Sequence, residues 1–406
     1  MSMEAVIARV IAVAENKLAA STQKLAPNQY PTATLPHNGQ WMFNNAGHWT
    51  SGFFVGCLWQ LHALTGKPEW AAAAQRWQEG LADKQRTWQS QHDFGFIYLP
   101  SYAASYAVTQ SASDLRQALA AAEALAWNWN PATRSLRTFE GWEPVQASKA
   151  YKQIVIIDFM MNLQMLVWGA KHVKHWGAYQ SFVDRQPEQD WMHMAVEHAR
   201  QVAANHVRPD GSTYHIVEYH PDNGAVIRRY QYQGYKDNST WARGQSWAVA
   251  GFSILHAETG LPEFLEVAKR TADRWLQMLS EQEDPAKGSY VPKWDFNAPY
   301  DPANDGPRDT SSAAITALGL LHLAEALPGT ECGQRYLCAA VNTLRALASP
   351  KYLASPDEPH AAVLKHATGN LPDNDKIDVG LVYADYYYLQ ALKKCQDMEA
   401  CRSYSL

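Results

Sequence analysis

Residues 49–84 read WTSGFFVGCLWQLHALTGKPEWAAAAQRWQEGLADK and contain two helical segments of opposite character. The first, 49–64, is apolar nearly all round, which is typical of a helix buried on every side. The second, 70–84, is amphipathic, which is typical of a helix with one face in water. The short break between them, with Gly66 and Pro68, predicts an antiparallel hairpin of an inner and an outer helix.

The same unit recurs along the chain. Comparable breaks between helical segments lie within 105–127, 253–275 and 320–344. Six pairs of helices predict an all-α (α/α)6 toroid that occupies residues 1–406 as a single catalytic domain. An open solenoid would give the same local pattern, so closure of the ring is an inference. The twelve expected helices lie near 5–20, 49–64, 70–86, 100–109, 113–127, 155–171, 191–206, 243–258, 263–281, 310–326, 333–347 and 379–394.

One segment departs from the helical pattern. Residues 213–231 read TYHIVEYHPDNGAVIRRYQ, with β-branched and aromatic residues on both sides of a Pro-Asp-Asn-Gly turn. This composition predicts a β-hairpin, placed just before an inner helix where it could reach over the mouth of the toroid.

Composition excludes several classes of function. The net charge is −5, from 35 Lys plus Arg against 40 Asp plus Glu, and no basic stripe occurs, so nucleic acid is not an expected partner. No apolar run reaches the ~20 residues of a membrane span. Residues 1–20 mix Glu4, Arg9, Glu15 and Lys17 into an apolar pattern, which is typical of an amphipathic helix and unlike the uninterrupted core of a signal peptide. This favours a cytoplasmic protein; a periplasmic one would require a leader already removed. The expected assembly is a monomer or homodimer.

The cysteines and aromatic residues point to a compartment and a ligand class. Five cysteines, an odd number without CxxC spacing, argue against a disulfide framework or structural zinc and favour a reducing compartment. Sixteen Trp and 20 Tyr suit carbohydrate, because aromatic faces pack on the C–H faces of sugar rings; the alternative is that they fill a wide core.

Two acidic residues are candidates for catalysis. Asp158 interrupts the apolar run IIDFMMN (156–162), where burial would raise its pKa toward that of a general acid; alternatively it only caps a helix. Asp93, in HDFGFIYLP (92–100), is either a second catalytic carboxylate or an ordinary turn residue.

Further residues are candidates for substrate binding. In TWARGQSW (240–247), Arg243 lies in the first turn of a helix, where its charge opposes the helix dipole unless an anionic ligand is bound. Trp247 shares its face, and the alternative for Arg243 is an ion pair with a neighbouring carboxylate. His215 and Gln233 flank the predicted hairpin. The sequence indicates no metal site and no cofactor.

Five segments together resemble the unsaturated glucuronyl hydrolases, glycoside hydrolase family 88. They occur in family order over about 300 residues: HDFGF (92–96), IIDFMMN (156–162), TWARGQSW (240–247), DTSSAAI (309–315) and DYYYLQAL (385–392). The family fold is an (α/α)6 barrel, in agreement with the helix count.

The resemblance implies roles for individual residues. Asp158 falls on the family's general acid/base and Asp93 on its second essential acid. The expected reaction removes a 4,5-unsaturated glucuronic acid from a lyase-generated oligosaccharide, by protonation at C4 and hydration at C5. The substrate-site positions are His215, Gln233, Trp241, Arg243 and Trp247, with Trp49 and Trp142 as aromatic walls.

Two departures from the family pattern, and three alternatives, accompany this interpretation. Residues 178–191 look like an insertion, and residues 366–380 lack the Ser and Lys pattern associated with sulfated substrates. The alternatives are an unsaturated rhamnogalacturonyl hydrolase and an inverting glycosidase acting on saturated glycans; a non-catalytic sugar-binding toroid is a third.

Overall fold

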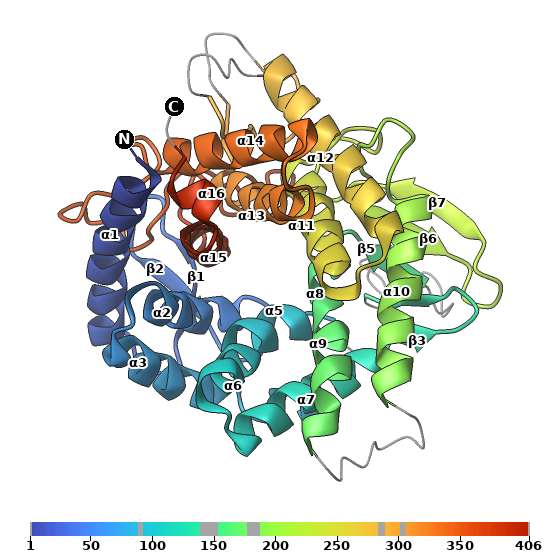
Figure 1. Cartoon of the computed structure of the whole chain (residues 1–406), viewed down its shortest axis with the longest axis horizontal. Coiled ribbons are helices and arrows are strands. Elements are labelled where there is room, and N and C mark those ends of the chain that lie inside the picture. The colour runs from blue at the N-terminus through green and yellow to red at the C-terminus, as the bar shows by residue number, and fades with distance from the viewer. Residues whose placement is uncertain are drawn as a thin grey trace.

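The structure is a computed structural model that describes residues 2–87, 92–138, 153–176, 187–282, 289–300 and 306–404. Within these residues most of the chain is helical, and the helices form two concentric rings (Figure 1).

The inner ring surrounds a central axis. Around the ring, each inner element contacts the next, and the last, α15, contacts the first, α2. The predicted toroid is therefore closed, which confirms the closure that local pattern alone left as an inference. The inner elements are α2 (Ser51–Thr65), α5–η2–α6 (Phe94–Tyr98, Leu99–Ala103, Ala104–Thr109), α8–α9 (Phe159–Asn162, Gln164–His172), α11 (Ala242–Thr259), α13 (Thr310–Ala326) and α15 (Val382–Asp397).

The outer ring pairs each inner element with an antiparallel neighbour. The first helix of the chain packs against α15, so the N-terminal and C-terminal helices together complete the sixth pair (Figure 1). The outer helices are α1 (Met3–Lys24), α3 (Pro68–Gln78), α7 (Ala112–Ala126), α10 (Pro187–Asn205), α12 (Pro262–Gln282) and α14 (Glu331–Leu347). Shorter helical pieces are η1 (Glu79–Leu81), α4 (Lys84–Thr87), η3 (Val173–Trp176) and α16 (Glu399–Arg402).

The difference between the two rings follows from burial. In α13 every residue from Thr310 to Leu321 is buried, whereas in its outer partner α14 the buried residues recur on one face. Inner helices also approach one another closely: a side chain at Gly319 in α13 would lie 2.8 Å from the Cα of Ala250 in α11. Small residues at such crossings allow six helices to meet around one axis.

Three small antiparallel sheets lie at the ends of the helices. They are β1–β2 (Tyr30–Thr34, Trp41–Asn44), β3–β4 (Trp129–Asn130, Ser135–Leu136) and β5–β6–β7 (Gln153–Ile156, Ile216–Tyr219, Val226–Tyr230). The predicted hairpin is β6–β7. The helix predicted over 155–171 is wrong at its start, because the β-branched run before Asp158 pairs with β6, with Ile156 opposite Ile216.

Two further findings concern the cysteines and the hydrophobicity of the helices. Cys395 and Cys401 form a disulfide between α15 and α16. The prediction of no disulfide framework, made from the number and spacing of the cysteines, is therefore wrong for this pair. The spacing alone did not show that the end of α15 and the short helix after it bring the two cysteines together. Within the described part of the chain, no helix combines the length and hydrophobicity required to cross a bilayer.

Candidate active site

The N-terminal ends of the inner helices converge on one cavity of about 430 Å³. Asp93 immediately precedes α5 and Asp158 immediately precedes α8, and both line this cavity. Arg243 in the first turn of α11 and Tyr383 in the first turn of α15 line it as well. The toroid therefore brings together these four side chains, which are far apart in the sequence.

Asp158 occupies the N-cap position of α8, but its side chain makes no capping hydrogen bond. The carboxylate is 13% exposed, and its Oδ2 lies 3.4 Å from Nε2 of His215. The pairing of β5 with β6 produces this approach, since the backbone N–H of Ile157 donates to the carbonyl of His215 at 2.9 Å. Helix capping therefore does not account for Asp158.

The tautomer of His215 follows from its other ring nitrogen. Nδ1 accepts a hydrogen bond from the backbone N–H of Gln233 at 3.3 Å, so in this arrangement the proton resides on Nε2, which faces Asp158. His215 is 2% exposed and packs on Trp241, with ring centroids 4.6 Å apart. A fixed imidazole thus presents an N–H to the carboxylate.

The pKa of Asp158 differs from the sequence-based expectation. Burial alone would raise it, but the hydrogen bond and charge of His215 and the positive charge of Arg243 together hold the pKa below its ordinary value. The expectation of a raised pKa is therefore wrong, because it considered the apolar neighbours in sequence and not the two partners brought in by the fold.

Asp93 has the raised pKa instead. Burial raises it most and the charge of Asp158 adds to this, while His92 and Asn162 act in the opposite direction. Oδ1 of Asp93 accepts from Nδ2 of Asn162 at 3.1 Å and lies 3.3 Å from Nε2 of His92. Its side chain makes no capping bond to α5, so an ordinary turn role does not describe it. The negative charge of Asp158 thus opposes ionisation of Asp93.

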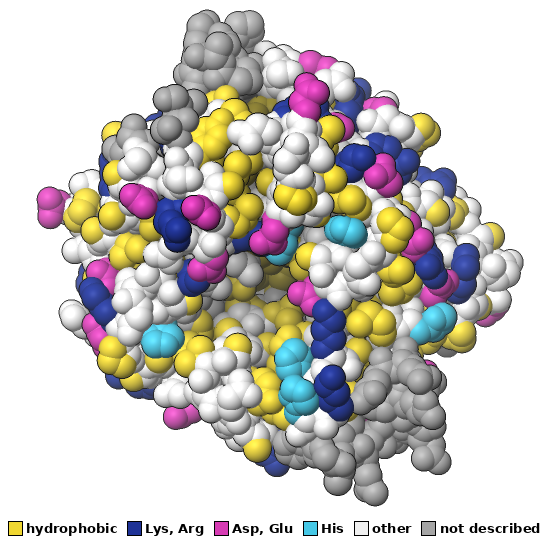
Figure 2. Space-filling view, viewed as in Figure 1, with side chains coloured by type: hydrophobic (Ala, Val, Ile, Leu, Met, Phe, Trp, Pro, Cys, Tyr) yellow, Lys and Arg dark blue, Asp and Glu magenta, His cyan; other side chains and the backbone are white. Residues whose placement is uncertain are grey.

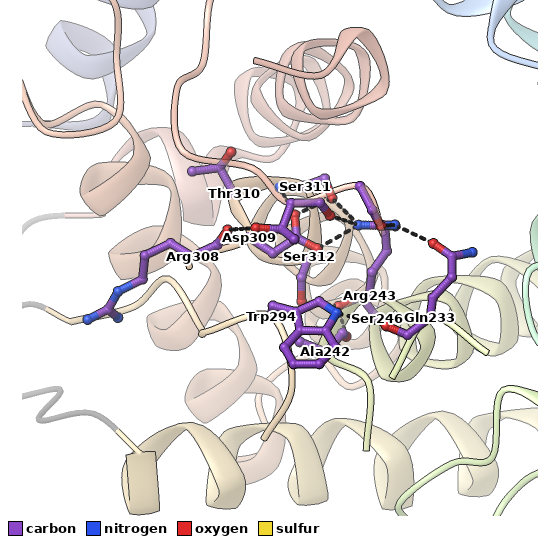
Figure 3. Close-up of polar contacts among 12 residues, drawn as sticks. Gln233, Ala242, Arg243, Ser246, Trp294, Arg308, Asp309, Thr310, Ser311 and Ser312 are labelled. Carbon is purple, nitrogen blue, oxygen red and sulfur yellow. Dashed lines mark hydrogen bonds and ion pairs between the residues drawn. The ribbon is translucent and has the colours of Figure 1, made fainter. Parts of the chain in front are cut away.

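Arg243 is buried and held by protein groups (Figure 3). Nη1 donates to Oδ2 of Asp309 at 2.8 Å and to the carbonyl of Thr368 at 2.5 Å. Nη2 donates to the carbonyl of Gly369 at 2.5 Å and to Oε1 of Gln233 at 2.9 Å. The ion pair with a carboxylate, given above as the alternative for Arg243, is present in the structure. Arg243 also lines the cavity, so its contact with an anionic substrate group stays a prediction.

Gln233 is oriented by that arginine. Because a guanidinium only donates, the amide oxygen of Gln233 must face Arg243, and its NH2 group is directed away from it. The amide nitrogen has no hydrogen-bond partner among the described residues, and Gln233 lines the cavity. Gln233 thus offers two N–H donors close to Asp158 and His215.

Comparisons with known proteins identify the family. No family model matches the chain. A curated unsaturated glucuronyl hydrolase of Formosa agariphila is 34% identical over 351 residues, which are 86% of this chain and 80% of that protein. The chain belongs to the unsaturated glucuronyl hydrolases. A second relative, the unsaturated glucuronyl hydrolase of a Bacillus species, is 29% identical over 89% of this chain and 91% of its own length.

Solved structures of unsaturated glucuronyl hydrolases share the fold. One that is specific for heparin superposes with a TM-score of 0.83 at 32% identity, over 96% of this chain and 97% of that chain. The Bacillus sp. enzyme superposes with a TM-score of 0.84 at 28% identity, over 98% of each chain. The (α/α)6 toroid and the assignment as a glycoside hydrolase are thereby confirmed.

The predicted tryptophans of this family member fall into three groups. Trp49 lines the cavity and packs on Tyr383, with ring centroids 5.1 Å apart. Trp241 and Trp247 are each 1% exposed and are not among the described residues that line the cavity, and their contact with substrate stays a prediction. Trp241 instead packs between His215 and Arg243, and Trp247 lies in the aromatic core beneath the cavity. Trp142 lies outside the described residues, as does most of the predicted insertion at 178–191.

Sequence reasoning missed several residues that line or support the site. His92 and Asn162 lay inside the quoted motifs, where their spacing from Asp93 and Asp158 was a usable signal. Asp309 was the first residue of the quoted motif 309–315. Tyr383, Asp373 and Asp375 gave no local signal, because their place in the site depends on contacts between distant parts of the chain.

Proposed function

We propose that the cavity binds the 4,5-unsaturated glucuronic acid at the non-reducing end of a short oligosaccharide and that the protein hydrolyses it by hydration. The observation that carries this proposal is the carboxyl group of Asp158, exposed to the cavity and fixed by His215. Family membership supports the substrate, and a solved unsaturated glucuronyl hydrolase that is 28% identical is described with dGlcA-Glc-Rha-Glc.

The chemistry proceeds in two proton transfers. Asp158 donates a proton to C4 of the C4=C5 double bond, and positive charge develops at C5 and the ring oxygen. The resulting carboxylate takes a proton from a water molecule, whose oxygen bonds to C5. This hemiketal opens by cleavage of the bond between C5 and the ring oxygen, and the hemiacetal left at C1 then releases the remaining sugar as an alcohol. Asp158 serves as acid and then as base, without a covalent intermediate.

Substrate binding would deliver the proton to Asp158. Before substrate binds, a proton shared by the two carboxyl groups would favour Asp93, whose pKa is raised, over Asp158, whose pKa is lowered by His215 and Arg243. The uronate brings a negative charge that offsets that of Arg243, and its sugar hydroxyls can donate to Asp93 and stabilise the ionised form. Both effects shift the shared proton toward Asp158, where the double bond lies.

Separate residues would orient the uronate. The free amide N–H groups of Gln233 are donors for its carboxylate or for the attacking water, and Arg243 contributes through its charge and its hold on Gln233. Trp49 and Tyr383 supply aromatic surface for the ring. Arg243 is thus a positioning residue in this proposal.

The neighbouring sugar would be unsulfated. Asp373 and Asp375 line the same cavity, and Asp373 accepts from the hydroxyl of Tyr232 at 2.5 Å and from Nδ2 of Asn370 at 2.8 Å. Lys376, the cation of this wall, is already paired with Asp375. Two carboxylates opposite a sulfate would repel it, so this wall favours a neutral sugar next to the uronate.

Replacement of Asp158 by asparagine tests the catalytic role. Asp158→Asn is expected to lower the rate of loss of the substrate's ultraviolet absorbance by roughly 10²–10⁴-fold, because asparagine cannot transfer the proton. The matched control is Asp397→Asn on the exposed end of α15, which should leave the rate unchanged. Circular dichroism of both variants checks that the fold is retained.

Solvent deuterium tests the mechanism separately. In D2O, protonation by Asp158 should place one deuterium on a single face of C4 of the released uronate. A fully active Asp158→Asn protein, or a product without deuterium at C4, would remove the proposed role of Asp158.

A further inference from the structure

A second cavity, of about 290 Å³, lies at the opposite end of the ring axis from the catalytic one. Arg243 in the first turn of α11 lines the catalytic cavity, whereas Glu258 at the end of the same helix lines the second. Fifteen residues of helix, about 22 Å along the helix axis, separate Arg243 from Glu258. Figure 2 views the molecule from the side of the second cavity and shows a hollow at the centre of that face.

The wall of this cavity contains a buried polar atom without a partner. Gln164 is 8% exposed, and its Nε2 donates to the carbonyls of Met160 at 3.1 Å and Gly251 at 3.3 Å. These two bonds fix the amide orientation, and Oε1 is left as a buried acceptor without a hydrogen-bond partner. Buried polar groups are nearly always hydrogen-bonded, and Gln164 lines the cavity, so a donor on a ligand would satisfy this oxygen.

The backbone beside the cavity is also unusual. Leu99–Ala103 forms a π-helical turn between α5 and α6, and Leu99, Pro100 and Ala103 line the cavity. Turns of this kind widen a helix locally and occur frequently at functional sites. The π-helical turn is an observation separate from the unpaired oxygen of Gln164, and both lie at the same cavity.

The remaining lining residues define the ligand chemistry. Aromatic side chains of Trp168, Tyr386 and Tyr387 supply apolar surface, and the Gln390 amide adds a donor and an acceptor. Glu258 is the one charged group among the described lining residues, and its carboxylate pairs with Lys171 at 2.5 Å. An anionic ligand is not favoured, because the described lining residues include no cation. A pure hydrocarbon is not favoured either, because it would leave Oε1 of Gln164 without a hydrogen bond.

We propose that the second cavity is a binding site for a neutral monosaccharide. A sugar hydroxyl donates to Oε1 of Gln164, the ring packs on the aromatic wall, and other hydroxyls reach Gln390 and Glu258. The volume lies at the lower limit of small-molecule sites and suits one sugar ring. Phe96 lines both cavities, so it separates this site from the catalytic one.

Ligand-observed NMR tests the proposal on the full chain with glucose, rhamnose and N-acetylglucosamine as probes. Saturation transfer to at least one of them is expected, with a Kd on the order of 1 mM. Ala104→Trp fills the mouth of the cavity, because Ala104 lines it and is half-buried, and should weaken binding at least tenfold. Ala107→Trp, exposed on the same helix, is the matched control and should bind as the wild type does.

Turnover distinguishes the two cavities. Hydrolysis by Ala104→Trp should equal that of the wild type, and the neutral sugar should not compete with the unsaturated substrate. The proposal is overturned if none of the three sugars binds, if binding survives in Ala104→Trp, or if the bound sugar inhibits competitively, since competition would place it in the catalytic cavity. These outcomes do not depend on the role of Asp158.

Discussion

Replacement of Asp309 by serine separates the ion pair with Arg243 from the helix cap that the same residue provides. Oδ2 of Asp309 pairs with Arg243, whereas Oδ1 accepts from the N–H of Ser311 at 3.0 Å at the start of α13. Serine is also a good N-cap residue, so Asp309→Ser keeps an acceptor for that N–H and removes the charge. The variant leaves the buried guanidinium without its carboxylate.

The expected cost follows from burial. The two side chains are 3% and 0% exposed, and truncation of one partner of such a pair costs about 3–5 kcal/mol, because the other charge stays buried and unpaired. For a chain of this length that corresponds to a fall in Tm of roughly 4–6 °C. Ser311→Ala removes the hydroxyl bond to Asp309 and a long 3.5 Å bond from Arg243 but keeps the buried ion pair; it is the control and should cost about 0.5–1.5 kcal/mol.

A double-mutant cycle with Arg243→Met decides the origin of the effect. Urea unfolding followed by circular dichroism should give a double variant less unstable than the sum of the single variants by about 2 kcal/mol or more. The activity of Asp309→Ser should show a rise in KM larger than the fall in kcat, because Gln233 loses its orientation. Additive costs, or a single cost below about 1 kcal/mol, would refute the assignment of Arg243 as a residue held by Asp309.

Three further changes have defined outcomes. Gly95→Ala would place a Cβ 2.5 Å from the Cα of Asn162, so α5 must shift from α8; we expect a loss of about 1–3 kcal/mol in unfolding free energy and at least a tenfold slower turnover, and an unchanged rate would contradict the close approach. Burial raises the pKa of Asp385 to about 7, so the folded protein keeps a proton that the unfolded chain releases from about pH 4; the unfolding free energy should fall as pH rises from about 4 to 7, and Asp385→Asn should flatten that profile. Thr330→Ala removes the cap that accepts from the N–H of Gly333 at 3.0 Å and should cost about 1 kcal/mol without affecting turnover; a kinetic change would mean that α14 is coupled to the site.

The helical organisation and the two carboxyl groups could be read from the sequence. The spacing of apolar residues along a helix indicates which of its faces are buried. The change from an all-round apolar to an amphipathic pattern in 49–84 therefore predicted both the inner and the outer helix. Asp158 was conspicuous in the sequence because burial of an ionised acid in an apolar run is costly. In the structure it lines the cavity. The predicted rise of its pKa was wrong, because the sequence shows the apolar neighbours of Asp158 but not His215 or Arg243.

Only the tertiary structure decided how the site is assembled. The segment before Asp158 was predicted as the start of a helix, but it forms a strand. Its β-branched run becomes a strand because β6, which is distant in sequence, pairs with it. Arg243 meets Asp309 across 66 positions of sequence, and the tryptophans near Arg243 are buried instead of lining the cavity. The physical reason is that local periodicity specifies which face of an element is buried, whereas the choice of neighbour depends on which helix ends meet once the ring has closed.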